Sequence, residues 1–133
     1  MTVRIGYDSS YEPPAPVVRV LISAPGHGRQ VAATALLDTG ADCTLLPAAI
    51  VRALTLPQVD WLRVAAVGGP PVQAPVYAAE LVVGQRRSLA RVVAFGGEPL
   101  LGRDWLNHLR LILDGPALTL SLQTPTRRTR QRR

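Results

Sequence analysis

The amino-acid sequence predicts a single, mostly β domain. Its 133 residues suffice for one domain with a real hydrophobic core and are too few for two. Twelve prolines and eleven glycines favour many short segments joined by turns over long helices. Between these turns lie short apolar runs that are rich in β-branched residues or alternate with polar ones, which is the pattern of strands.

The first half of the chain predicts a β-hairpin, an acidic loop and a small helix. The run VVRVLIS is rich in valine, and RQVAATALL places apolar side chains at every second position. The glycines of APGHG, between these runs, suit a turn that joins them as a hairpin. The expected elements are strands at 17–23, 29–37 and 43–47, a loop at 38–42, and a helix at 48–54 that begins after Pro47.

The second half predicts a longer hairpin, a further strand, a helix and a closing strand. The hairpin has a Gly-Pro tip, GGPP, and the closing strand alternates leucine with threonine or serine. Asp104 is the predicted N-cap of the helix, and both Trp61 and Trp105 are predicted in the core. The expected elements are strands at 61–67, 72–84, 89–95 and 118–122, with the helix inside 100–111.

The domain organisation follows from charge and composition. We expect an N-terminal arm at 1–16 that is mobile or adds a strand, a folded body at 17–122, and a basic, disordered tail at 123–133. Five of the 15 arginines lie in 127–133, and without them ten arginines face nine acids. The high pI is therefore a property of the tail. The complete absence of lysine beside 15 arginines indicates a GC-rich, bacterial source genome.

Several classes of protein are disfavoured by the sequence. The single cysteine, Cys43, excludes an internal disulfide, and with only His27 and His108 beside it we expect no metal site. The N-terminus lacks the apolar segment of a signal peptide, and no apolar run reaches the length of a membrane span. We therefore expect a cytoplasmic protein that needs no metal or organic cofactor and has no membrane partner.

The segment ALLDTGADCTLLP contains the strongest candidate for chemistry. Asp38 follows an apolar strand, and a carboxylate in such a place is costly unless it is protonated or hydrogen-bonded. Gly40 allows backbone N–H groups to approach that carboxylate, and Thr39 adds a short hydroxyl. These three residues are also common in surface turns, so the tripeptide alone does not distinguish a site from a turn.

Three motifs together resemble the retropepsin family of aspartic proteases. They are LLDTGADCTLL, a later LLGRD, and a Gly-rich hairpin tip between them, in the order and spacing of the family across about 17–122. The resemblance implies a bacterial member of the family, with a closed β-barrel of the acid-protease fold. It also implies a flap hairpin, one short C-terminal helix and a homodimer.

The resemblance implies an aspartic endopeptidase whose second catalytic acid comes from another copy of the chain. The chemistry of this family needs two carboxylates that share one proton across a water, and this sequence has one Asp-Thr-Gly. Neither Asp104 nor Asp114 has the context of an acid loop. A twofold homodimer would bring two copies of Asp38 together. One would take a proton from the attacking water while the other donates to the carbonyl oxygen of a peptide substrate.

The remaining motif residues take their roles from the same resemblance. Thr39 would bond across the dimer axis, and Gly40 would present its backbone to the acid and the substrate. Asp42 would bond the substrate backbone or pair with Arg103, and both options stay open. The full set comprises catalytic Asp38, Thr39 and Gly40; substrate-binding Ala41, Asp42, Val67, Gly68 and Gly69; and supporting Leu101, Gly102 and Arg103.

Two details of the sequence modify this picture. Pro70 and Pro71 depart from the Gly-richer retroviral flap tips and remove two backbone donors, which puts flap closure in question. Ala41 has no hydroxyl to donate to an ionised carboxylate, so we expect the activity optimum in mildly rather than strongly acidic solution.

Two other functions remain open at the level of sequence. The chain could be a catalytically weak member of the fold that dimerises or captures peptides. The Arg-rich segment 127–133 could bind nucleic acid, although a solubilising role for it is favoured. For the dimer, we expect the strand 118–122 as the interface, with the 1–16 arm as a possible partner strand.

Overall fold

The prediction of a mostly β, single-domain fold is confirmed. The computed structural model describes residues 2–26, 28–65 and 67–123, which form ten strands and two short helices. The strands are β1 (Thr2–Gly6), β2 (Val17–Ser23), β3 (Gln30–Leu37), β4 (Thr44–Leu46), β5 (Gln58–Val64), β6 (Val72–Val83), β7 (Arg86–Ala94), β8 (Leu100–Leu101), β9 (Arg110–Asp114) and β10 (Thr119–Gln123). The helices are α1 (Ala48–Ala53) and α2 (Arg103–Leu106).

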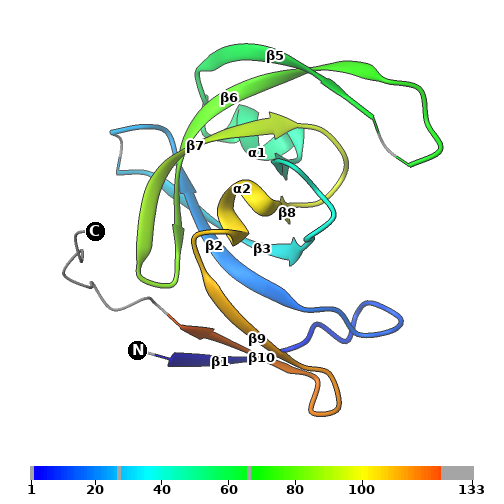
Figure 1. Cartoon of the computed structure of the whole chain (residues 1–133). Helices are drawn as coiled ribbons and strands as arrows, with labels where there is room; N and C mark the ends of the chain where they lie inside the picture. Colours follow the sequence, from blue (N-terminus) through cyan, green and yellow to red (C-terminus); the bar gives the residue numbers. More distant parts are fainter. Residues whose placement is uncertain (1, 27, 66, 124–133) are drawn as a thin grey trace, which may run out of the picture.

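The strands form two sheets. Seven strands pair in the order β2-β3-β8-β4-β7-β6-β5, and β2 also pairs with β6, so six of them follow one another in a ring. The seventh, β5, pairs only with β6 and forms the hairpin predicted from the Gly-Pro tip. The other three strands form a separate sheet in the order β1-β10-β9. Figure 1 shows this small sheet at one end of the molecule and the hairpin of β5 and β6 at the other.

The core fills the ring of strands and reaches the small sheet. Ile22, Leu81, Leu101 and Leu120 are fully buried, and they come from four different strands of the two sheets. The hairpin β2–β3 forms as predicted, with Val18 opposite Ala35 and both side chains buried. Burial of such aliphatic side chains, about 1.5–3 kcal/mol each, is the main source of stability for a fold of this kind.

Short parallel pairings bring together two segments that are far apart in the sequence, one of which leads into the acid loop at 38–42. β8 pairs in parallel with β3, so that Leu36 and Leu37 lie opposite Leu100 and Leu101. β4 pairs in parallel with β7 and, through Leu45 and Leu100, antiparallel with β8. The residues that follow β3 and those that follow β8 are consequently neighbours in space although about 60 residues separate them in the chain.

The second helix lies inside the expected range 100–111, but its start differs from the prediction. α2 covers only Arg103–Leu106, and its N-cap is Gly102, without a side-chain cap. The prediction of Asp104 as N-cap is therefore wrong. The following residues become β9, whose pairing with β10 outweighs the helical tendency of their sequence.

Residues near both ends of the chain take part in the small sheet. Thr2–Gly6, inside the expected arm, pairs antiparallel with β10, and Ile5 packs against the core. Gln123, the first residue of the expected tail, is the last residue of β10. The Arg-rich segment 127–133 lies outside the described residues.

Two further expectations are corrected. The strand 118–122 was expected at a dimer interface, yet β10 is the middle strand of its sheet, and its Leu120 and Leu122 are buried in the chain's own core. Trp105 is in the core as predicted, at 3% exposure, whereas Trp61 is 59% exposed on the hairpin of β5 and β6.

Candidate active site

Asp38 begins the turn that follows β3. Its backbone N–H donates to the carbonyl oxygen of Leu101 (3.1 Å), and its own carbonyl accepts from the N–H of Ala41 (3.2 Å). Its carboxylate, half-buried, accepts a hydrogen bond of 2.9 Å from the N–H of Gly40. A Cβ on residue 40 would lie 3.2 Å from that same carboxylate oxygen, so glycine gives the acid close access to the backbone.

Beneath the acid loop, the backbone at Gly102 passes very close to the backbone at Cys43, and only glycine fits there. A Cβ at this position would lie 2.4 Å from the carbonyl oxygen of Cys43, a distance that backbone atoms cannot tolerate. The N–H of Gly102 donates to the hydroxyl of buried Thr44 (3.2 Å). The supporting position expected for Gly102 therefore has a steric cause: two backbones pass each other without room for a side chain.

The carboxylate of Asp104 ties the two crossing segments together. It accepts from the hydroxyl of Thr44 (2.8 Å), the backbone N–H of Thr44 (3.1 Å) and the N–H of Trp105 (2.9 Å). Sequence reasoning missed this pairing of Thr44 with Asp104. The available signal was an acid directly after LLGR and a threonine two residues after the acid loop, but nothing local connects positions 60 residues apart.

Arg103 holds the acid loop from the other side. It forms an ion pair with Asp42 and also donates to the backbone carbonyl of Thr39 (2.6 Å). Of the two roles left open for Asp42, the structure contains the contact with Arg103. Thr39 and Asp42 are both exposed, so these two contacts of Arg103 lie at the surface of the loop.

A cleft of about 550 Å³ opens directly above Asp38. The acid loop supplies one wall, and the opposite wall comes from β5 and the residues that continue it, including Leu62, Val64 and Val67. Leu45, Phe95 and Leu100 add an apolar base. Its size is that of a typical ligand site, and most of its lining residues are apolar.

The predicted site residues fall into three groups. Asp38, Gly40, Ala41, Asp42 and Val67 line the cleft together. Thr39, Gly68 and Gly69 do not line it, and Leu101, Gly102 and Arg103 lie beneath or beside the acid loop. Sequence reasoning did not single out Leu62 and Arg63, whose exposed positions on β5 face the cleft in the fold.

Cys43 stands at the edge of the cleft and is half-buried. Burial, together with the carboxylates of Asp104 and Asp42, raises the pKa of its thiol. A protonated thiol is a poor nucleophile, so this cysteine is suited to be part of the wall rather than a reactive group.

The cleft contains one carboxylate that is available for chemistry. Of its two acidic lining residues, Asp42 is paired with Arg103, which leaves Asp38. Within the described ranges, no group of three or more His, Cys, Asp or Glu side chains is placed to hold a metal ion. No helix among the same residues is long and apolar enough to cross a membrane.

A family model described as aspartyl protease matches residues 23–105 of the chain. This match spans the acid loop, the hairpin of β5 and β6, and the LLGRD motif. No protein of curated function matches the chain in a sequence comparison.

Solved structures of retropepsin-like proteases share the fold. A retropepsin-like aspartic protease from Rickettsia conorii superposes with a TM-score of 0.71 over 93% of this chain and 91% of its own, at 15% identity. The EIAV protease in complex with an inhibitor gives 0.51 over 70% and 86%, at 26% identity. The Simian Foamy Virus (mac) protease gives 0.50 over 69% and 96%, at 23% identity.

Proposed function

The chain belongs to the aspartyl protease family, and from this premise we propose that it is an endopeptidase that cuts peptide bonds as a homodimer. Water is held between the Asp38 carboxylates of two copies. One carboxylate takes a proton from the water as it attacks the peptide carbonyl, and the other, protonated, donates to the carbonyl oxygen. Two carboxylates on opposite sides of one water repel each other when both are ionised, so the pair carries one proton.

One observation carries the proposal: the cleft offers a single unpaired carboxylate. Asp42 is engaged by Arg103, and Asp104 accepts three hydrogen bonds from Thr44 and Trp105 beneath the loop. Water activation by this chemistry needs a second acid opposite the first, and a symmetric dimer supplies it from an identical loop. The half-exposed turn of Asp38, with Thr39 at its surface, leaves the loop open to such an approach.

The small sheet leaves edges for that dimer. β10 is paired on both sides, so the contact uses the outer edge of β9 or β1 instead. On β9, Ile112 and Leu113 are 51% and 55% exposed, and on β1 Val3 is 43% exposed. Open strand edges with apolar side chains are ready to pair with another chain.

The remaining assignments are part of the same proposal. Thr39 bonds across the dimer axis, Gly40 and Ala41 face the substrate, and the tip at Val67, Gly68 and Gly69 closes over it. The expected optimum is mildly acidic, because Ala41 offers no hydroxyl to stabilise the ionised acid.

The test is Asp38→Asn with a diverse peptide pool at several pH values. Asparagine keeps the oxygen that accepts from Gly40, so the fold and the dimer mass should persist while cleavage falls by about 1,000-fold. A statine inhibitor, whose hydroxyl mimics the tetrahedral intermediate, should block the wild-type protein. Cleavage that survives Asp38→Asn and ignores the statine would disprove the mechanism; peptide binding without any cleavage by the wild type would favour a binding module.

A further inference from the structure

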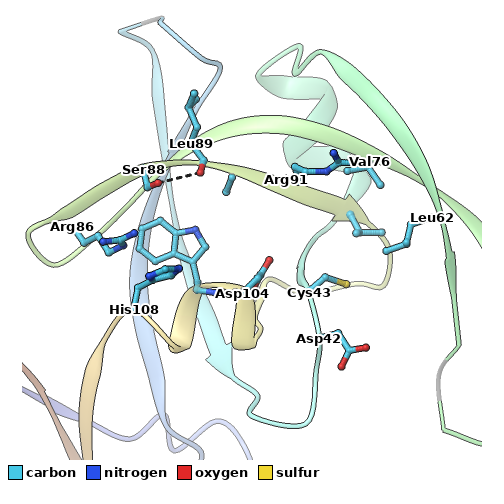
Figure 2. A pocket seen from close by; sticks show the side chains of 13 residues that line it. Asp42, Cys43, Leu62, Val76, Arg86, Ser88, Leu89, Arg91, Asp104 and His108 are labelled. Atoms are coloured by element: carbon cyan, nitrogen blue, oxygen red, sulfur yellow. Dashed lines mark hydrogen bonds between the residues drawn. The ribbon is translucent and has the colours of Figure 1, made fainter. Parts of the chain in front are cut away.

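A second pocket adjoins the cleft on the side away from Asp38. It has a volume of about 430 Å³ and lies between β7 and α2. Asp42, Cys43 and Leu62 line both this pocket and the cleft, so the two cavities share a wall. Figure 2 shows these three residues at one end of the pocket, with Arg86 and His108 at the other. Because the two cavities share these residues, we expect a peptide that lies in the cleft and continues past Cys43 to reach this pocket.

Among the charged side chains that line the pocket, Arg86 differs from the rest because it has no ion-pair or hydrogen-bond partner in the described part of the chain. Asp42 pairs with Arg103, and Arg91 pairs with Asp60. Asp104 has both oxygens engaged by Thr44 and Trp105. Arg86, in contrast, has no carboxylate partner among the described residues, and its Nε is buried without an acceptor there. Its neighbour Arg87 points elsewhere and pairs with Glu80.

The Trp105 ring holds Arg86 in place. The guanidinium carbon lies 5.5 Å from the centroid of the Trp105 ring, a cation–π contact, and Trp105 itself is buried. Stacking occupies the face of a guanidinium and leaves the N–H groups at its edge for acceptors in the same plane. A half-buried arginine fixed in this way loses little freedom when it binds a carboxylate as a fork.

We propose that this pocket binds the side-chain carboxylate of an aspartate or glutamate in the substrate, several residues from the bond that is cut. Arg86 provides the paired donors, and His108 lies beside it at the same end of the pocket. The inference rests on the proposed function and adds a substrate class to it: peptides with an acidic residue outside the central, apolar positions. Arg86 acts here as a specificity residue, remote from the reacting atoms.

The experiment compares peptides that differ only in whether one side chain ends in a carboxylate or in an amide. A substrate cut by the wild-type protein is prepared with a single Glu or a single Gln at each position from the second to the sixth on both sides of the scissile bond. At one position we expect Glu to be favoured about 10-fold in kcat/KM, through KM with kcat unchanged, as a charge-assisted contact of moderate strength gives. The preference should shrink as salt is raised.

Two arginine variants serve as test and control. In Arg86→Gln the Glu and Gln peptides should be cut with equal kcat/KM, and Arg86→Lys should retain part of the preference. Arg87→Gln, next in sequence but paired with Glu80, should keep the full preference. Urea unfolding of each variant checks that the fold persists. If Arg86→Gln does not fold, the comparison of Arg86→Lys with the wild type decides, since a lysine lacks the fork and must weaken the preference.

A measurement without catalysis separates this inference from the proposed function. Labelled Glu and Gln peptides are titrated onto the Asp38→Asn protein, and anisotropy should give the same ratio of affinities as the KM values. Equal binding and equal cleavage of the two peptides at every position would overturn the pocket assignment while leaving the protease intact. A Glu preference that persists in Arg86→Gln would overturn it as well. If nothing is cut, the same titration onto the wild-type protein still decides the pocket.

Discussion

The floor and the flap of the cleft are built in opposite ways. The floor, residues 38–46 with 100–106, is held by long-range hydrogen bonds among Thr44, Gly102 and Asp104, and its Leu46 and Leu101 are buried. The flap, residues 58–65 and 67–76, pairs along its length mainly with itself, and Val59 and Trp61 are 51% and 59% exposed. One wall of the cleft is therefore fixed by the core, and the other is a two-stranded ribbon.

From this difference we expect the floor to hold the acid in place and the flap to move. A catalytic acid must be held to within a fraction of an ångström, which a buried crossing with satisfied hydrogen bonds can do. A cover must admit and release substrate, which a ribbon with few buried contacts allows. Among the described residues, the flap contacts the rest of the fold where Ala74, Val76 and Val64 pack with Val93, and where Asp60 forms an ion pair with Arg91. Substitutions in the floor should therefore change stability, and substitutions at the flap tip should change activity.

The largest effect is expected from Gly102→Ala in the floor. The new Cβ would lie 2.4 Å from the Cys43 carbonyl oxygen, and backbone on both sides prevents an easy adjustment. We expect a loss of about 3 kcal/mol in the free energy of unfolding, measured by urea denaturation. Gly97→Ala is the matched control, because nothing lies within 4 Å of its added Cβ. Equal stability of the two variants would contradict the account of the crossing.

A smaller loss is expected from Thr44→Val. The substitution removes the buried hydroxyl that accepts from the Gly102 N–H and donates to Asp104. We expect the free energy of unfolding to fall by about 2 kcal/mol. Thr44→Ser keeps the hydroxyl and should recover most of this stability. A valine variant as stable as the wild-type protein, with the loss found in the serine variant instead, would mean that the methyl group rather than the hydrogen bonds matters at this position.

Gly68→Ala at the flap tip should affect activity and spare stability. Gly68 has a φ of +78°, a conformation that costs a residue with a Cβ about 1–2 kcal/mol, and its surroundings are open. Because its open surroundings let the tip change conformation and relieve this strain, we expect kcat/KM to fall about 10-fold while urea denaturation changes little. Gly28→Ala, in the exposed turn of the β2–β3 hairpin, is the control and should leave both quantities unchanged. Lost stability with full activity would reverse the roles assigned to floor and flap.

The smallest effect concerns Cys43, which belongs to the floor and lines the cleft. The raised pKa of its thiol means that less thiolate is present at a given pH than in a free cysteine. Its alkylation by iodoacetamide should therefore be slower at pH 7 and reach half its maximal rate at a higher pH than that of a free cysteine. The urea-unfolded protein provides the reference. A native thiol that reacts as fast as this reference would contradict the placement of Cys43 in the wall.

The sequence predicted the features that depend on local signals. Asp38 at a turn after an apolar strand, the hairpin β2–β3 and the hairpin with the GGPP tip all follow from alternation and turn residues. The contact of Thr44 with Asp104 could not be predicted, because it depends on the parallel pairing of β8 with β3 and of β4 with β7. The sequence around Leu109 and Leu111 suits a helix equally well, and only the pairing of β9 with β10 decides it.

The dependence on long-range strand pairing explains two further features that the sequence did not predict. Trp61 was expected in the core, but β5 pairs with β6 alone among the described strands, and all of its residues except Val64 are exposed. The pairing of Thr2–Gly6 with β10 joins the two ends of the chain, and no local pattern announces it. Only the assembled sheets decide which apolar residues are enclosed.

The most direct test of the central idea follows mass and activity in the same samples as the protein is diluted. Analytical ultracentrifugation gives the fraction of dimer, and a fluorogenic peptide gives the turnover per chain. If the active centre contains one Asp38 from each of two copies, turnover per chain must fall in proportion to the dimer fraction, and added Asp38→Asn protein must depress it further. Undiminished turnover per chain in solutions of pure monomer would contradict the account.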